Sequence, residues 1–517
     1  MLPEFKSAAM LDYSSSANES GMRSALEQVR SRFGSSYPLV IGGKRITTPE
    51  TFQSANPANP SECIGNFSKA TLAHVNDAVE AATRAYQSWS WIPAEERANV
   101  LLRAASILRR RRHEMSAAMV FEVGKSWPEA DGDTAEAIDF CEFYAREMIR
   151  YGDRQPITPN PGEHNALEYI PLGVGVVIPP WNFPCAIAMG MTAATIVTGN
   201  TAILKPSSDA PLTAWKIYEI FEEAGVPPGV VNFLTGPGGT IGDALVEHPR
   251  VRFVAFTGSM PVGIGISERA ARVPEGQIWI KRAILEMGGK DFTIVDEDAD
   301  LESAVSGVYA GAFGFQGQKC SACSRAIVHR SRIAEFGDRL AAMVKTMSVG
   351  PTEKKEHFLG PVVNARAEKT ILEYMEVGKK EGRLIAGGAK HSGPGYFLQP
   401  TVFTDVKPDA RIAQEEIFGP VLAVIPAGSF DEAVSIANGT IYGLTGAYYS
   451  PDRAKIVEAK RRLFVGNLYI NRKCTGALVG IHPFGGFNMS GTDSKAGGRD
   501  YLGLFLQGKA ITEFVGS

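Results

Sequence analysis

The feature that most constrains the fold is a regular alternation of short apolar runs and longer helical segments between residues 174 and 256. The runs are rich in β-branched residues and are bounded by Gly, Pro and Asn. Strands are expected at 174–178, 201–204, 230–234 and 251–256, and helices at 185–198, 211–224 and 239–247. Strands separated by helices of this length predict a parallel sheet with helices on its faces. This is the architecture of dinucleotide-binding domains.

The rest of the chain divides into further regions. With 517 residues it is too long for one core, so two or three domains are expected. Residues 1–36 are interpreted as an N-terminal arm, and a second α/β unit is expected from about 291 to 467. Helical spacing also predicts helices at 71–89, 93–108, 115–123, 131–151, 334–347, 365–381, 430–437 and 452–461, and residues 503–514 alternate as in a strand.

Composition argues against several classes of function. A net charge of −3 and a pI of about 6.3 give no reason to expect a nucleic acid or an anionic membrane as partner. The basic cluster Arg109–Arg112 lies in a helical pattern and is interpreted as a solvated helix face. The N-terminus lacks the apolar core of a signal peptide, and the most apolar segment, 185–197, is too short to span a bilayer. We expect a cytoplasmic protein.

The six cysteines are scattered along a long chain, which fits a reducing compartment. Cys320 and Cys323 form a single C-x-x-C pair, a poor zinc site without a second pair. The eight histidines have no ligand spacing, so no metal site is expected. Cys323 is interpreted as a packing residue, with the alternative that it captures Cys320 as a disulfide under oxidation.

Three residues are candidates for catalysis. Cys320 follows a turn of small and polar residues that would keep the thiol reachable, and a thiol of lowered pKa is a strong nucleophile. Lys319 is interpreted as a solvated lysine that could lower this pKa. Glu286 ends an apolar run just before two glycines, where a carboxylate can act as a general base. Asn182 stands among prolines in a rigid turn that can hold its amide toward an oxyanion. Singly, each has a plainer structural interpretation.

Together these three segments resemble the aldehyde dehydrogenase superfamily in order and spacing, from about Pro38 to Phe514. The resemblance implies oxidation of an aldehyde by NAD, with Cys320 as nucleophile, Glu286 as base and Asn182 as oxyanion donor. It implies an α/β fold with a Rossmann-type dinucleotide-binding domain, an α/β catalytic domain and a small β oligomerisation arm. The expected bounds are 37–150 and 170–286, then 287–485, then 151–169 and 486–517.

The resemblance also assigns a cofactor site. Lys205 would bind the adenine ribose, and Ser208 stands where members strict for NAD usually have a glutamate, so NAD is expected and NADP stays open. Ser259 would face a phosphate at a helix N-terminus. Glu416 would bind the other ribose, with Phe418 packing nearby. Further contacts are expected at Ile178, Pro180, Trp181, Gly238 and Gly258. The glycine spacing at 236–242 departs from the common fingerprint and is a weak signal alone.

Two separated strings carry the signal for the substrate. The segments 313–323 and 475–480, with 493–498, resemble the branch of the superfamily that oxidises L-glutamate γ-semialdehyde, formed from 1-pyrroline-5-carboxylate, in proline catabolism. By this resemblance the N–H groups of Gly476 and Ala477 and the hydroxyl of Ser321 would hold the α-carboxylate. Phe183 and Phe484 are assigned to the same site.

Two other interpretations remain open. One is another aldehyde dehydrogenase, for instance a CoA-acylating semialdehyde enzyme, although such enzymes typically lack the glutamate found at 286. The other is a catalytically retired structural protein on this scaffold, although all three candidate residues are present. A homo-oligomer is expected from the family habit, and a transient complex with proline dehydrogenase is a further hypothesis.

Overall fold

Five parallel strands form the centre of the first sheet, and four of them lie where the alternation along the chain predicts strands. The computed structural model describes residues 2–516. The sheet has the order β11-β10-β7-β8-β9-β2-β3, and its last two strands are antiparallel to their neighbours. Its strands are β2 (Leu39–Ile41), β3 (Lys44–Ile46), β7 (Val174–Ile178), β8 (Thr201–Leu204), β9 (Val231–Phe233), β10 (Val251–Thr257) and β11 (Arg282–Glu286).

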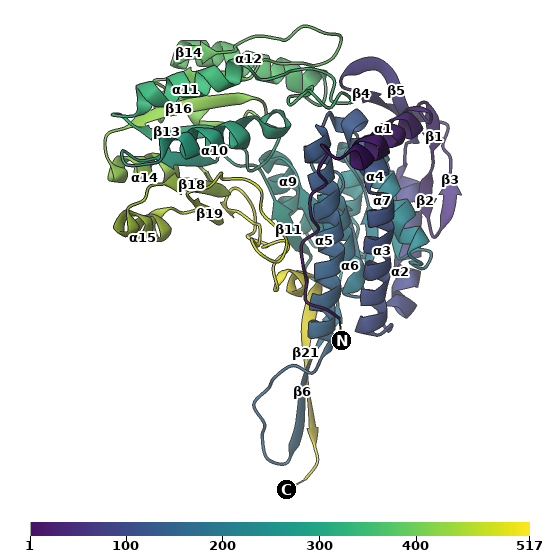
Figure 1. The fold of residues 1–517 in the computed structure, drawn as a ribbon. Coiled ribbons are helices and arrows are strands. Elements are labelled where there is room, and N and C mark those ends of the chain that lie inside the picture. Colours follow the sequence, from purple (N-terminus) through teal and green to yellow (C-terminus); the bar gives the residue numbers. More distant parts are fainter. Residues whose placement is uncertain (1, 517) are drawn as a thin grey trace.

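Helices cover this sheet, and those of the N-terminal region pack together beside it (Figure 1). They are α1 (Ser16–Arg30), α2 (Leu72–Trp89), α3 (Ala94–Arg110), α4 (Arg112–Val123), α5 (Trp127–Gly152), α6 (Ala186–Val197), α7 (Pro211–Glu223), α8 (Asp243–Glu247) and α9 (Met260–Ala270). Gly124 ends α4 with a φ of 69°. Helix α5 begins one turn earlier than predicted, because Pro128 fits the first turn of a helix.

A three-stranded sheet of order β1-β5-β4, which the sequence patterns did not predict, lies in the same region. Its strands are β1 (Ser35–Tyr37), β4 (Thr51–Asn56) and β5 (Asn59–Ser68). The short connection between β4 and β5 contains Pro57 and Ala58.

A second seven-stranded sheet forms the other α/β body in Figure 1, with the order β14-β15-β16-β13-β12-β18-β19. All neighbours are parallel except β14 and β15. Its strands are β12 (Phe292–Val295), β13 (Arg325–His329), β14 (Arg383–Ala386), β15 (Thr401–Thr404), β16 (Val421–Ala427), β18 (Thr445–Tyr449) and β19 (Asn467–Ile470). Its helices are α10 (Leu301–Phe313), α11 (Ile333–Lys345), α12 (Ala365–Glu381), α13 (Arg411–Gln414), α14 (Phe430–Asn438) and α15 (Arg453–Arg462).

An antiparallel pair of strands projects beyond both bodies (Figure 1). Strand β6 (Glu163–Pro171) pairs along its length with β21 (Leu506–Phe514). The predicted strand at 503–514 starts later, because residues 501–505 form a 3₁₀ turn. A small ladder of β17 (Tyr442–Gly443) and β20 (Phe487–Asn488) lies beside the second sheet.

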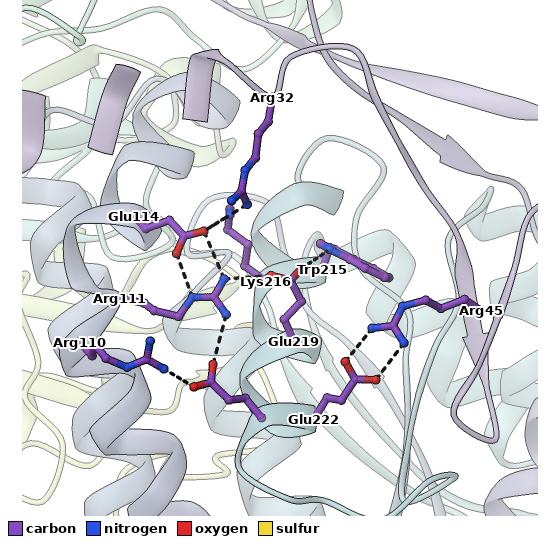
Figure 2. A network of polar contacts seen from close by, with 10 residues as sticks. Arg32, Arg45, Arg110, Arg111, Glu114, Trp215, Lys216, Glu219 and Glu222 are labelled. Atoms are coloured by element: carbon purple, nitrogen blue, oxygen red, sulfur yellow. Dashed lines mark hydrogen bonds and ion pairs between the residues drawn. The ribbon is translucent and has the colours of Figure 1, made fainter. Parts of the chain in front are cut away.

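The interpretation of Arg109–Arg112 as a solvated face is wrong for Arg111 and Arg112. Both side chains are largely buried, 14% and 12% exposed, and both are paired. Arg111 donates hydrogen bonds to Glu114 of α4 and to Glu219 of α7, both at 2.9 Å (Figure 2). Arg112 bonds Asp131 of α5 at 2.6 Å. The basic run therefore holds helices together, because carboxylates distant in sequence face it.

Among residues 2–516, no helix combines the length and apolar character that crossing a membrane requires. Within the same range, no group of three or more His, Cys, Asp or Glu side chains is placed to hold a metal ion.

Candidate active site

The turn before Cys320 is buried and strained. Phe315 and Gln316 have φ values of 50° and 57°, a left-handed conformation that L residues rarely adopt. Gln316 holds this turn by donating to the carbonyls of Gly124 and Pro361, and Gln318 accepts from the N–H of Val363 at 2.9 Å. The polar side chains of this turn therefore anchor the backbone. Cys320 itself is partly exposed.

The two glycines after Glu286 bring distant segments into contact. A Cβ at Gly289 would lie 2.6 Å from the carbonyl oxygen of Cys320, and one at Gly288 would lie 2.1 Å from the carboxylate of Glu416. Real side chains do not pack this closely, so only glycine lets the chain pass there. The glycines thus place β11, the cysteine turn and Glu416 against one another.

The prediction of a lowered pKa for Cys320 is wrong. Burial, together with the carboxyls of Asp291, Glu416 and Glu286, raises its pKa well above the ordinary value. Lys319 is not a solvated lysine, since its side chain is 10% exposed and its Nζ bonds Glu129 at 2.7 Å. The thiol therefore needs a proton acceptor before it can attack.

Glu286 lies at the end of β11, as predicted, with its carboxyl buried. Its Oε1 accepts hydrogen bonds from the hydroxyl and the N–H of Ser494, while its Oε2 has no partner among the described residues. Burial raises its pKa to about 8, although the bonds from Ser494 act in the other direction. A carboxyl of this pKa can take up or release a proton near neutral pH.

Asn182 lies against the turn that carries Cys320. Its Nδ2 donates to the backbone carbonyl of Gln318 at 3.0 Å, and the side chain is 4% exposed. The amide is therefore fixed within two residues of the nucleophile. This fits the predicted oxyanion role, which requires a donor that is already in place.

The first sheet has its topological switch point between β7 and β10. From β7 the chain moves outward through β8 and β9, and it then returns to β10 on the other side of β7. Ligands of open α/β sheets bind beyond the carboxyl ends of the strands at such a point. Ile178 is the last residue of β7 and Pro180 follows it, while Gly258 and Ser259 follow β10. Ser259 is exposed and is the N-cap of α9, whose first N–H groups can bind an anion.

Lys205 lies at the end of β8, next to the glycine turn. Its ammonium donates to the carbonyl of Pro206 at 3.2 Å, and burial lowers its pKa to about 8. A Cβ at Gly242 would lie 3.7 Å from its Cε. Gly238 is exposed and begins the π-helical turn Gly238–Gly242. Ser208, three positions after Lys205, is also exposed.

Glu416 contacts the glycine pair after Glu286, and Phe418 contacts Trp181. The N–H of Gly289 donates to Glu416 at 3.1 Å, and the ring of Trp181 meets that of Phe418 edge-on at 5.4 Å. Phe418 has a φ of 58°, so its ring is held by a strained backbone. Burial raises the pKa of Glu416 to about 7.

The loop around Gly476 has its carbonyls engaged and its amides available. Arg472 donates to the carbonyls of Thr475 and Gly476, both at 3.1 Å. No hydrogen bond among residues 2–516 uses the N–H of Gly476 or Ala477. These two N–H groups are therefore free donors, as a carboxylate site requires.

The remaining predicted substrate residues lie in two places. Phe183 packs edge-on against Phe315 with 6.4 Å between ring centres, beneath the ammonium of Lys125. Ser321 is largely buried directly after the nucleophile. Phe484 is half-buried and fixed by two backbone bonds to Ala496.

Two residues of the site had no predicted role. Ser494 hydrogen-bonds Glu286, although 208 positions separate them. The carboxyl of Asp291 raises the pKa of Cys320. Ser494 lies within the string 493–498 that resembled the branch, so position in a motif was the one available signal. For Asp291 the only signal was its place beside Gly288, Gly289 and Lys290.

Three comparisons place this geometry among known proteins. The aldehyde dehydrogenase family pattern matches residues 45–511. The 1-pyrroline-5-carboxylate dehydrogenase of Geobacillus sp. (strain WCH70) is 54% identical over 513 residues, which are 99% of this chain and 100% of that one. A crystal structure of 1-pyrroline-5-carboxylate dehydrogenase from Thermus with bound NAD has a TM-score of 0.98 at 51% identity, covering 99% of both chains. Proline utilization A from Bdellovibrio bacteriovorus has a TM-score of 0.97 at 43% identity, covering 99% of this chain and 53% of that one.

Proposed function

The chain belongs to the aldehyde dehydrogenase family, and we propose that it oxidises L-glutamate γ-semialdehyde, formed from 1-pyrroline-5-carboxylate, to L-glutamate with NAD. The observation that carries the substrate is the pair of N–H groups at Gly476 and Ala477, which no hydrogen bond among the described residues uses. These donors suit the α-carboxylate that distinguishes this semialdehyde from simple aldehydes. Full-length relatives named for 1-pyrroline-5-carboxylate support the same substrate.

The side chains of the site have separate roles in the reaction. The sulfur of Cys320, once the thiol has lost its proton, bonds to the aldehyde carbon. The amide of Asn182 and the N–H of Cys320 stabilise the oxyanion. Loss of hydride leaves a thioester on Cys320, and Glu286 then takes a proton from the water that hydrolyses it.

The cofactor fits the crevice at the switch point of the first sheet. Ile178, Pro180, Trp181, Gly258 and Ser259 would line it at the carboxyl ends of β7 and β10. Further contacts would come from Lys205, Ser208, Gly238, Glu416 and Phe418. When bound, NAD accepts the hydride. We assign the dinucleotide-binding domain to residues 37–150 and 170–286, the catalytic domain to 287–485, and the N-terminal arm to 1–36.

The environment of Ser208 leaves NADP as a second cofactor. This hydroxyl is exposed and uncharged, so it would not repel a 2′-phosphate. Lys205, a cation whose aliphatic stem is buried, precedes it in the same turn.

We further propose a cytoplasmic homo-oligomer in which residues 151–169 and 486–517 supply the subunit contacts. The projecting pair β6–β21 supports this, because an extended two-stranded arm gains stability only by packing against another surface. A transient complex with proline dehydrogenase would deliver the substrate. The observation that supports this complex is that the chain is similar to about half of a proline utilization A chain.

The first test is NADH production from 1-pyrroline-5-carboxylate, with propanal and succinate semialdehyde in parallel and NAD against NADP. We expect a strong preference for the pyrroline substrate, because propanal has no carboxylate for Gly476 and Ala477 and the carboxylate of succinate semialdehyde lies one carbon closer to its aldehyde. Activity confined to the other aldehydes would keep the chemistry of Cys320 and overturn the substrate.

The two catalytic residues are separable by mutation. Cys320→Ala is expected to abolish NADH formation, because no sulfur remains to bond the aldehyde. Glu286→Gln is expected to retain a fast first turnover and lose steady turnover by roughly two to four orders of magnitude, since thioester hydrolysis lacks its base. Rapid-mixing absorbance of NADH measures both phases. Full steady activity of either variant would contradict the roles.

A further inference from the structure

Two buried thiols, Cys323 and Cys474, lie close to the same glycine although 151 positions separate them in the chain. Both belong to the same apolar cluster, and each is 1% exposed. A Cβ at Gly311 would lie 3.3 Å from the Cβ of Cys323 and 3.8 Å from the Sγ of Cys474. Both cysteine side chains therefore pack against this glycine of α10.

The hydrogen bonds of the two thiols show where each points. The Sγ of Cys323 donates to the Oγ1 of Thr293 at 3.3 Å and to the carbonyl of Arg325 at 3.6 Å. The Sγ of Cys474 donates to the carbonyl of Ser321 at 3.6 Å. The neighbouring thiol of Cys474 lowers the pKa of Cys323, while the pKa of Cys474 is raised. Cys323 is therefore the more readily deprotonated of the two thiols.

Cys320 lies in a different environment from Cys323, although three positions separate them. Its charged neighbours are the carboxyls of Asp291, Glu416 and Glu286, whereas the thiol of Cys323 donates to Thr293 and to the carbonyl of Arg325. The C-x-x-C spacing therefore does not make these two residues the natural pair.

Cys323 can be reached by a small molecule. It lines a narrow pocket with Glu416 and Phe418 at the cofactor crevice. The pocket leaves about 20 Å³ of space, enough for one molecule of the size of water. Hydrogen peroxide is close to that size, whereas larger oxidants are excluded.

We propose that Cys323 and Cys474 are a peroxide-sensitive thiol pair that closes to a disulfide. The thiol of Cys323 gives up its proton and its sulfur attacks one peroxide oxygen; the O–O bond breaks, the leaving oxygen takes up that proton and departs as water, and a sulfenic acid remains. The sulfur of Cys474 then attacks the sulfenic sulfur, the S–O bond breaks, and a second water leaves. Two thiols lose two protons and two electrons, and the peroxide is reduced to two waters. The bond ties the segment after the nucleophile to the loop of Gly476 and Ala477.

Peptide mapping tests this proposal in the full-length protein. Trypsin leaves Cys320 and Cys323 together on residues 320–325 and Cys474 on residues 474–495. The Cys320→Ser variant therefore assigns any link to Cys323. After dilute peroxide we expect a cross-linked pair of these peptides, reversed by dithiothreitol. Of the six cysteines this variant keeps five, and one disulfide leaves three free thiols after denaturation.

Matched variants make the outcome decisive. Cys63→Ser removes a half-buried thiol elsewhere and should leave the cross-link unchanged. Cys474→Ser should abolish it, and circular dichroism checks that each variant is folded. The proposal fails if Cys323 and Cys474 both stay free at peroxide levels that oxidise Cys320 in the wild type. It also fails if the wild type instead links Cys320 to Cys323.

Discussion

At the scale of single residues, Glu286 depends on a partner that is remote in sequence. Ser494 holds one carboxylate oxygen, and the other oxygen is free toward the site. Burial raises the pKa of this carboxyl, and the serine moderates that increase. The base strength at neutral pH is therefore set by one hydroxyl contact.

Removal of Ser494 should move the pH dependence of turnover. In Ser494→Ala the pKa of Glu286 rises above about 8, because two hydrogen bonds to the ionised form are weakened or lost. Since the base must be ionised, steady turnover at neutral pH should fall roughly three- to tenfold and recover at alkaline pH. Steady-state rates across that pH range measure the shift.

Ser494→Thr is the control for this prediction, because it keeps the hydroxyl and should keep the profile close to that of the wild type. An unchanged profile in Ser494→Ala would show that the serine only fills space.

At the scale of elements, α4 and α7 are joined by the charged cluster in Figure 2. Glu114 accepts from Arg111 and from the ammonium of Lys216, which is 5% exposed. Despite burial, these cations lower the pKa of Glu114 to about 2. The ion pairs therefore contribute to the docking of the two helices as long as the carboxylate is ionised.

Glu114→Gln should destabilise the protein by about 2–3 kcal/mol at neutral pH. The pKa is lowered in the folded state, so this contribution is present above the ordinary value of 4.5 and disappears as the pH falls toward 2. Thermal unfolding of both proteins at neutral and acidic pH measures the difference, which should shrink with acidification.

Glu223 provides a matched control on α7, since its side chain is 45% exposed and it pairs with Arg110 and Arg111. Glu223→Gln should cost less than about 1 kcal/mol. Equal losses for both variants would mean that burial of the cluster is unimportant.

At the scale of the whole molecule, the projecting pair β6–β21 ends in an exposed aromatic side chain. Phe514 is 78% exposed at the end of β21. Exposed aromatic rings on a projecting strand mark a contact surface.

Phe514→Glu should therefore lower the native mass measured by light scattering, because a charge would be buried in the subunit contact. Val457→Glu, at a position 53% exposed on α15, is the control and should leave the mass unchanged. A mass that is the same in both variants would place the subunit contact elsewhere.

Local patterns determined much of the fold in advance. The helix predicted at 365–381 matches α12 residue for residue, and its N-cap Asn364 accepts from the N–H of Ala367 as such a cap should. The β-α alternation likewise predicted the parallel strands β7 to β10. These features follow from spacing, caps and glycines, which act over a few residues.

The sequence by itself determined the candidate residues, because Cys320, Glu286 and Asn182 stand in strings whose order and spacing are informative. Tertiary structure decided their chemistry. It raised the pKa of Cys320 where a lowered one was expected, paired Lys319 with Glu129, and bound Glu286 to Ser494. Burial and charge at a site depend on segments far apart in the chain, and short-range patterns do not carry that information.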